Sequence, residues 1–349
     1  MLIFFIYYFI FIIFSSAHKS SLSTRNNESY FSLFILLSFV LIVYTPIFSQ
    51  NHSRDYSNYL SFFESTNNIN FSVEFIYKLL KSLVYKISSN FYFFLLPIAV
   101  ITFSIIFYVC WKDSEYPLLS IFLYLSYFYF TDGATTIRAG LSSAFFLFAV
   151  YNLKNNNKKS AFMACIMATL THYTGVFSFI IFFCNKETFN VKLWIFIILL
   201  GIFISFFNFV SISNVVSIMP LPSNVKDKIE IYLALSNIDN AKKANIFSLG
   251  NLIQLVLVFF YIHKFNINNT HYILNLKLMI LGYFFLCIFS NFDTVPFRLN
   301  QYFCVSEILL WPSLINMFKR IENKKIVYLI TIFYGFFRVL MHFRTQTLL

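Results

Sequence analysis

Charged residues are scarce in this chain. Only 11% of its 349 residues are Asp, Glu, Lys or Arg, whereas 59% are hydrophobic and the mean hydropathy is +0.71. A soluble globular domain carries about 25% charged residues. The composition therefore excludes an ordinary soluble domain and predicts an all-α polytopic integral membrane protein.

The motifs of nucleotide and metal chemistry are also missing. The sequence has no glycine-rich phosphate loop with its lysine and no Rossmann glycines, which argues against ATP-driven transport. It has no HxxxH, DxD or HExxH spacing and no CxxC pair, so we expect neither a metal site nor a disulfide framework. The cysteines fit small buried hydrophobic residues; they are Cys110, Cys165, Cys184, Cys287 and Cys304.

The charge that is present is mostly positive. The formal net charge is +12, but the basic residues are scattered between apolar stretches and form no basic domain that could hold a duplex. We therefore expect no nucleic-acid partner. An anionic lipid or a lipid-linked substrate is the more natural partner of such a chain.

Apolar stretches of suitable length predict about ten to twelve transmembrane helices in a single polytopic domain over residues 1–349. The two stretches that flank His172 are too short for two full crossings, so they form one kinked helix, two half helices or a re-entrant hairpin. The predicted stretches are Leu2–Phe14, Tyr30–Ser49, Phe91–Trp111, Pro117–Phe130, Ile137–Leu153, Ser160–Leu170, Gly175–Cys184, Leu193–Ser211, Ile246–His263, Tyr272–Ser290, Tyr302–Phe318 and Ile326–His342.

The loops predict an orientation. The first stretch resembles a signal peptide but has no Lys or Arg before it, which favours a membrane anchor over a cleaved leader. If residues 15–29 are cytoplasmic and the chain alternates, the short lysine-rich loops fall on the cytoplasmic side, as the positive-inside rule requires. The long loops 50–90 and 212–245 are then periplasmic, in a multi-pass protein of the bacterial inner membrane.

The loop 50–90 contains a further helix signal. Residues 71–87 read FSVEFIYKLLKSLVYKI, with apolar residues at helical spacing and lysines between them. This pattern predicts an amphipathic helix, either lying at the outer leaflet or packed inside the bundle.

Several polar residues fall on the predicted periplasmic face. An arginine at the mouth of a membrane helix, as at Arg138, is costly to desolvate and therefore suggests a functional site. Arginine matches phosphate oxygens, and carboxylate or imidazole can accept a proton from a hydroxyl, so the group suits an anionic, sugar-like substrate. Helix capping, interface snorkelling and solvated loops are the structural alternatives. The group comprises Arg54, Asp55, Asp132, Arg138, His172, Asp293 and Arg298.

Four phrases in this order carry a family resemblance. The residues 138–142 (RAGLS) and 168–175 (ATLTHYTG) are similar to phrases of the EpsG-like family of polysaccharide polymerases, as are 54–59 (RDYSNY) and 297–302 (FRLNQY). The chain departs from the family pattern at Ala139, where glutamine is common, and it lacks a glycine beside the acid before Tyr59. Together the phrases cover roughly residues 50–318.

The resemblance implies a Wzy-type polymerase, either GT-C-like or of a related all-helical type, acting on undecaprenyl-pyrophosphate-linked oligosaccharides without metal or nucleotide. It implies that Arg138 and Arg298 bind the pyrophosphate and that Asp55 or His172 orients or deprotonates the acceptor hydroxyl. Arg54, Tyr59 and Tyr302 are further candidates for substrate binding. Membrane lipids and a chain-length regulator are the implied partners. The alternatives are a flippase or transporter of the same lipid-linked unit and an O-antigen ligase.

Overall fold

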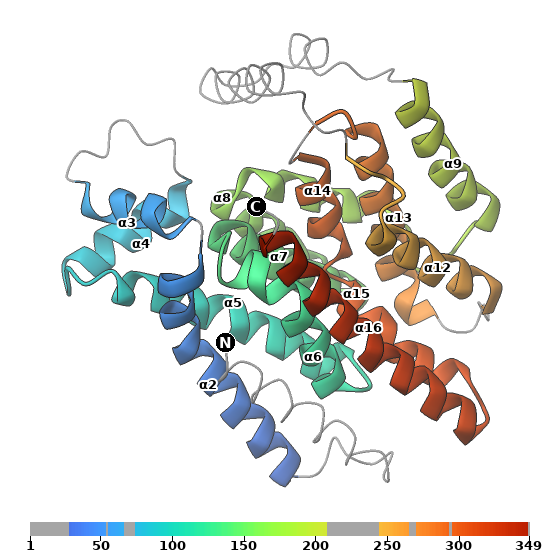
Figure 1. Cartoon of the computed structure of the whole chain (residues 1–349), viewed down its shortest axis with the longest axis horizontal. Helices are drawn as coiled ribbons and strands as arrows, with labels where there is room; N and C mark the ends of the chain where they lie inside the picture. The colour runs from blue at the N-terminus through green and yellow to red at the C-terminus, as the bar shows by residue number, and fades with distance from the viewer. Residues whose placement is uncertain are drawn as a thin grey trace. The chain divides into compact units, whose positions relative to one another are not determined.

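The computed structural model describes residues 28–53, 55–65, 74–207, 244–264, 270–292 and 295–347. These residues form helices and no strand, which confirms the predicted all-α class (Figure 1). The chain divides into two compact units, one of Met1–Ile180 with Glu307–Leu349 and one of Ile181–Ser306. The predicted anchor Leu2–Phe14, most of the loop 212–245, and the residues Arg54 and Asp293 lie outside the described residues.

The observed helices follow the predicted apolar stretches closely. The first unit contains α2 (Glu28–His52), α3 (Tyr56–Glu64), α4 (Phe75–Tyr85), α5 (Tyr92–Asp113), α6 (Pro117–Phe128), the π-helix η3 (Tyr129–Gly133), α7 (Ile137–Lys154), α8 (Lys158–Thr171), α15 (Glu307–Ser313), η6 (Leu314–Met317) and α16 (Ile321–Thr347). The second unit contains α9 (Val191–Phe207), α12 (Leu249–Lys264), η5 (Thr270–Tyr272), α13 (Ile273–Ile288) and α14 (Val295–Cys304), and the 3₁₀ helix η4 (Tyr173–Phe183) joins the two units along the chain.

Two of the described helices are long and apolar enough to cross a membrane, by length and composition. They are Tyr92–Asp113 and the segment Ile321–Phe343 of α16. Five shorter apolar helices accompany them, at Ile35–Gln50, Tyr173–Phe183, Val191–Phe207, Leu249–His263 and Ile273–Ile288. The total number of spans and their orientation stay predictions.

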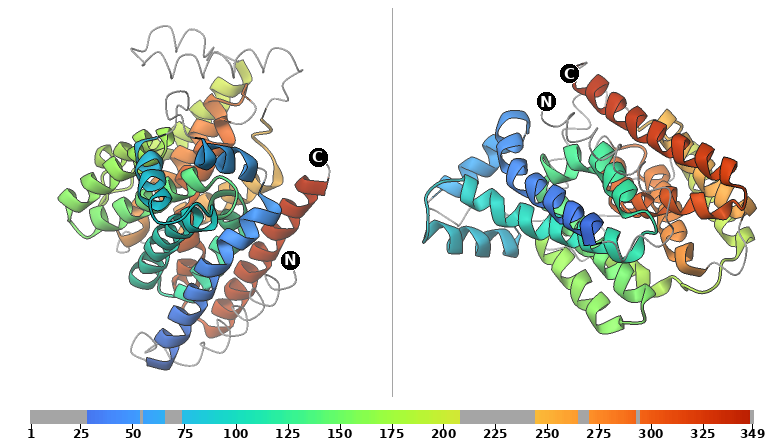
Figure 2. Two further views of the ribbon diagram at one scale, coloured as in Figure 1. Left: turned by 90° about the vertical axis from the view of Figure 1, so that its left-hand side faces the viewer. Right: turned by 90° about the horizontal axis from the view of Figure 1, so that it is seen from below.

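The described parts of the loop 50–90 form two helices, α3 and α4, which pack as a helical hairpin beside α5 (Figure 2). The predicted amphipathic helix is present as α4, and α3 precedes it. One face of α4 is buried in the unit, whereas Phe75, Leu79 and Leu83 on another face are each 46–61% exposed. Whether that exposed apolar face meets a membrane stays a prediction.

Lys81 fastens α4 to the end of α3. The pattern of lysines suggested a polar face, but Lys81 is buried and its Nζ donates to the carbonyl oxygens of Phe62 at 2.7 Å and Ser65 at 2.6 Å. The last carbonyls of a helix lack partners inside the helix and attract a positive charge. Lys81 therefore acts as the C-terminal cap of α3.

We expect Lys81→Met to destabilise this hairpin. Methionine keeps the apolar stem but removes the ammonium, which leaves the capped carbonyls without their donor at a cost of about 1–3 kcal/mol. The measurement is thermal unfolding of the purified protein in detergent. Lys78→Met is the matched control, because Lys78 is exposed on the same helix, and an equal loss of stability in both variants would contradict the capping role.

The two short stretches around His172 form two helices that double back. α8 ends at Thr171, His172 is extended with φ −157° and ψ 143°, and η4 begins at Tyr173. The turn requires glycine at position 175, because a Cβ there would lie 2.2 Å from the Ala168 carbonyl oxygen. The result is a helical hairpin with His172 at its tip.

Candidate functional site

A buried glutamate joins two of the predicted site residues in the first unit. The Glu74 carboxylate accepts a hydrogen bond from Arg138 Nη1 at 2.7 Å through Oε2, and its Oε1 lies 2.9 Å from His172 Nδ1. The Glu74 side chain is only 3% exposed. The three side chains therefore form one connected polar cluster.

Each member of the cluster stands at the end of a helix. Glu74 is the residue before α4, Arg138 is the second residue of α7, and His172 follows the last residue of α8. Helix ends leave backbone groups without intrahelical partners, so polar side chains are tolerated there. Glu74 thus meets two partners that are distant in the sequence: Arg138 follows it by 64 positions and His172 by 98.

Small residues bring these helix ends together. Gly140 lies against η3, where an added Cβ would come within 2.0 Å of the Asp132 carbonyl oxygen. Ser142 Oγ donates to the Ala168 carbonyl oxygen at 2.9 Å, which ties α7 to α8. The small-residue pattern after Arg138 therefore serves close packing of α7 against η3 and α8.

The electrostatics keep Glu74 ionised. Burial opposes the charged form, but the hydrogen bond with His172 and the charge of Arg138 outweigh it, so the pKa of Glu74 lies below its ordinary value. Glu74 and Arg138 thus carry opposite full charges at neutral pH. Arg138 keeps 30% of its side chain exposed and His172 keeps 15%, so both can reach a ligand from outside.

The ring of Tyr59 packs against the Arg138 guanidinium. It is buried on α3, and the Arg138 guanidinium lies 5.6 Å from its ring centroid, within the range of a cation–π contact. Asp55 immediately precedes α3, and its charge adds to the burial that raises the pKa of Tyr59. Among the described residues Arg138 pairs with Glu74 rather than with Asp55.

The remaining predicted residues are placed elsewhere. Asp132 is buried in η3, where its Oδ1 accepts a hydrogen bond from Thr136 Oγ1 at 3.3 Å. Arg298 and Tyr302 lie on α14 in the second unit, Arg298 exposed and Tyr302 buried. The substrate-binding roles of Arg298, Tyr302 and Arg54 stay predictions.

Sequence reasoning missed Glu74. It stands in the phrase FSVEFIYK as the only acid of a lysine-rich amphipathic helix, and a single acid before an apolar helix suggests an N-terminal cap. The sequence pattern does not predict that Glu74 pairs with Arg138 and His172. In the described part of the chain, no group of three or more His, Cys, Asp or Glu side chains is placed to hold a metal ion.

A family comparison decides what kind of protein carries this cluster. The model of the EpsG family matches residues 31–348, nearly the whole chain. The chain belongs to the EpsG family. The resemblance predicted from the four phrases is thereby confirmed, and the match spans every element of the cluster.

Membership in the EpsG family also fixes the general role. Together with the apolar helices, it identifies a membrane protein of polysaccharide biosynthesis. Comparisons with characterised proteins and with solved structures found no match. The finer function of this EpsG-family chain is therefore argued from its own residues.

Proposed function

We propose that this EpsG-family protein is a Wzy-type polymerase that joins oligosaccharide repeat units carried on undecaprenyl pyrophosphate, at the periplasmic face of the bacterial inner membrane. The observation that carries the proposal is Glu74, which holds an arginine through one oxygen and a histidine through the other. An anion-binding group and a proton-accepting group are thus fixed side by side.

Arg138 suits the donor side of this reaction. Its guanidinium has five N–H donors, of which one is directed at Glu74 and another interacts with the Tyr59 hydroxyl. The remaining donors and the exposed part of the side chain can bind pyrophosphate oxygens in the bidentate manner that arginine favours. In the transfer, the bond between the anomeric carbon and the pyrophosphate oxygen breaks, and Arg138 stabilises the negative charge that grows on the leaving group.

His172 suits the acceptor side. When Glu74 accepts a hydrogen bond from Nδ1–H, the other ring nitrogen, Nε2, carries the lone pair. The acceptor hydroxyl forms the new bond to the anomeric carbon, and its proton passes to Nε2. The imidazolium that results is stabilised by the Glu74 carboxylate, which makes Glu74 a positioning residue. The geometry therefore favours His172 over Asp55 as the base.

Deletion and complementation test the proposal. Cells that lack their own polymerase but keep the other enzymes of the same glycan should regain a ladder of chain lengths on a gel when this protein is expressed. A flippase would instead restore transport in cells that trap the unpolymerised unit on the cytoplasmic leaflet. A ligase would restore attachment of glycan to the lipid A core without lengthening it. Stable expression without a ladder would reject the polymerase.

A further inference from the structure

Besides the Glu74 cluster, the first unit contains two buried charge pairs, Lys154 with Asp113 and Arg338 with Glu307. The Glu307–Arg338 pair is far from Glu74 in the sequence. Glu307 is the first residue of α15 and is 3% exposed, and Arg338 lies within the long apolar helix α16 and is 8% exposed. Charged residues inside apolar helices are expensive to bury and are therefore candidates for a functional site.

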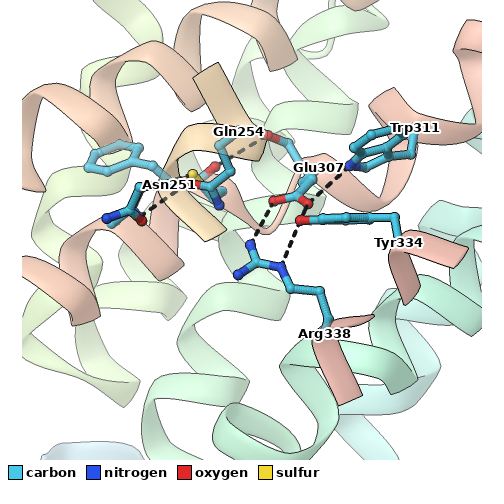
Figure 3. Close-up of polar contacts among 10 residues, drawn as sticks. Asn251, Gln254, Glu307, Trp311, Tyr334 and Arg338 are labelled. Atoms are coloured by element: carbon cyan, nitrogen blue, oxygen red, sulfur yellow. Dashed lines mark hydrogen bonds and ion pairs between the residues drawn. The ribbon is translucent and has the colours of Figure 1, made fainter. Parts of the chain in front are cut away.

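The pair is held by aromatic neighbours (Figure 3). Tyr334 donates its hydroxyl proton to Glu307 Oε1 and accepts a hydrogen bond from Arg338 Nε at 2.7 Å. Trp311 Nε1 donates to the same carboxylate oxygen at 3.1 Å. The Arg338 guanidinium stacks over Tyr127, 4.0 Å from the ring centroid. Both charged groups are thus fixed in orientation.

One nitrogen of Arg338 remains without a hydrogen bond in the described part of the chain. Arg338 Nη2 lies 3.6 Å from Glu307 Oε2, which is too far for a hydrogen bond. Nη2 is buried and has no hydrogen-bond partner among the described residues. A buried donor without a partner costs free energy, so an oxygen atom that completes it would be stabilised.

A small cavity lies beside this charge pair. Its walls include Ser126, Tyr127, Glu307, Tyr334 and Arg338, and it has room for about one water-sized group. An oxygen there can accept from Nη2 and donate to Oε2. An anion in so small a cavity would lie beside Glu307 Oε2 as well as Nη2, because these two atoms are only 3.6 Å apart, and this disfavours an anion. A neutral hydroxyl group satisfies both partners.

The cavity is linked to the helix that carries Arg138 through η3. His342, one turn beyond Arg338 in α16, stacks on Phe130 of η3 with ring centroids 4.9 Å apart. η3 leads directly into α7, the helix that carries Arg138. The two polar sites are thus connected through η3.

We propose that Glu307 and Arg338 form a second subsite, which binds a hydroxyl group of a neutral sugar in the glycan. The identity of that glycan rests on the polymerase function proposed above. Arg138 then takes the pyrophosphate of the lipid-linked unit, and the Glu307–Arg338 subsite takes its sugar. This subsite positions substrate and takes no part in bond breaking.

Trp311 provides a direct binding assay, because its indole touches Glu307. The chain has three tryptophans, so Trp111→Phe/Trp194→Phe leaves Trp311 as the single fluorophore in the full-length protein. The probe is the single-repeat undecaprenyl-linked glycan extracted from polymerase-deficient cells, and undecaprenyl phosphate is the sugar-free control. We expect a saturable change in Trp311 fluorescence with the glycan and none with undecaprenyl phosphate.

The double variant Glu307→Leu/Arg338→Leu tests the pair itself. Replacing both partners of a buried ion pair with apolar residues often preserves folding, whereas removing one leaves a buried charge. We expect the apparent affinity for the glycan to fall at least about tenfold, from the loss of charged hydrogen bonds. Glu307→Gln, which keeps the shape and the contact with Trp311, should weaken binding less.

The outcomes separate the two proposals. The wild-type protein could make the ladder while Trp311 shows no response to the glycan, which is expected if only water occupies the cavity. That result overturns the subsite and leaves the polymerase proposal intact. Equal responses to glycan and undecaprenyl phosphate, or undiminished affinity in a folded double variant, also overturn it. A glycan response without any ladder supports the subsite and rejects the polymerase.

Discussion

Replacing Arg138 with alanine is expected to abolish the glycan ladder and leave single-repeat glycolipid in a polymerase-deficient host. Arg138 pairs with Glu74, and in the proposed mechanism it supplies the exposed donors for the leaving pyrophosphate. Loss of one such donor group lowers a rate by about 10²- to 10³-fold. Glycan gel electrophoresis of cells with matched protein levels provides the measurement.

Two further variants make this result specific. Arg138→Lys keeps the charge but loses the planar fork of donors, so we expect a ladder that is present but strongly weakened. Arg320→Ala removes an arginine of equal charge that is exposed before α16, and we expect normal chain lengths. Normal chain lengths from a stably expressed Arg138→Ala protein would remove Arg138 from the reaction.

Replacing Glu74 with glutamine is expected to have the second largest effect. Glutamine preserves the shape of the side chain but removes the negative charge that pairs with Arg138 and that, in the proposed mechanism, stabilises protonated His172. General-base assistance of this kind contributes about 10²- to 10⁴-fold to a rate, and we expect a loss within that range. The measurement is the rate at which purified protein elongates the single-repeat glycolipid in proteoliposomes.

A double-mutant cycle connects the loss to His172. If Glu74 acts by positioning His172, then Glu74→Gln should cost little more in a His172→Ala background, because residues that act as a unit are not additive. Glu64→Gln is the matched control, since Glu64 is an exposed carboxylate on the same hairpin. Fully additive losses would show that Glu74 and His172 act separately.

Hydrophobic length and periodicity predicted most helices of this chain. The observed α5 and α7 start and end within two residues of the predicted stretches, and α16 extends five residues beyond its predicted stretch at each end. Burial or lipid contact of apolar surface dominates in these helices. Two features of the helices were not predicted from the sequence. α3 is too short to stand out, although Tyr59, Phe62 and Phe63 are buried at helical spacing. The stretch predicted over Tyr302–Phe318 is interrupted after Cys304, before α15 begins at Glu307.

The candidate site was only half predictable. Arg138 and His172 stood out because polar residues at the ends of apolar helices are costly and therefore conspicuous. Their proximity depends on the turn at Gly175 and on the packing of Gly140 against η3, which local patterns do not contain. Glu74 remained hidden because its importance comes from two partners that are distant in the sequence.

The charge balance of the cluster bears on turnover. Because Glu74 already neutralises Arg138, the pyrophosphate of the proposed reaction meets a pair with no net charge rather than an unpaired cation. Attraction in the resting state is therefore modest, and the arginine contributes most when extra charge appears during bond breaking. A polymerase must discard a spent lipid carrier after every addition. Under the proposed function, the Glu74 carboxylate competes with the spent carrier for the Arg138 guanidinium, which favours release of the carrier over a long-lived complex with it.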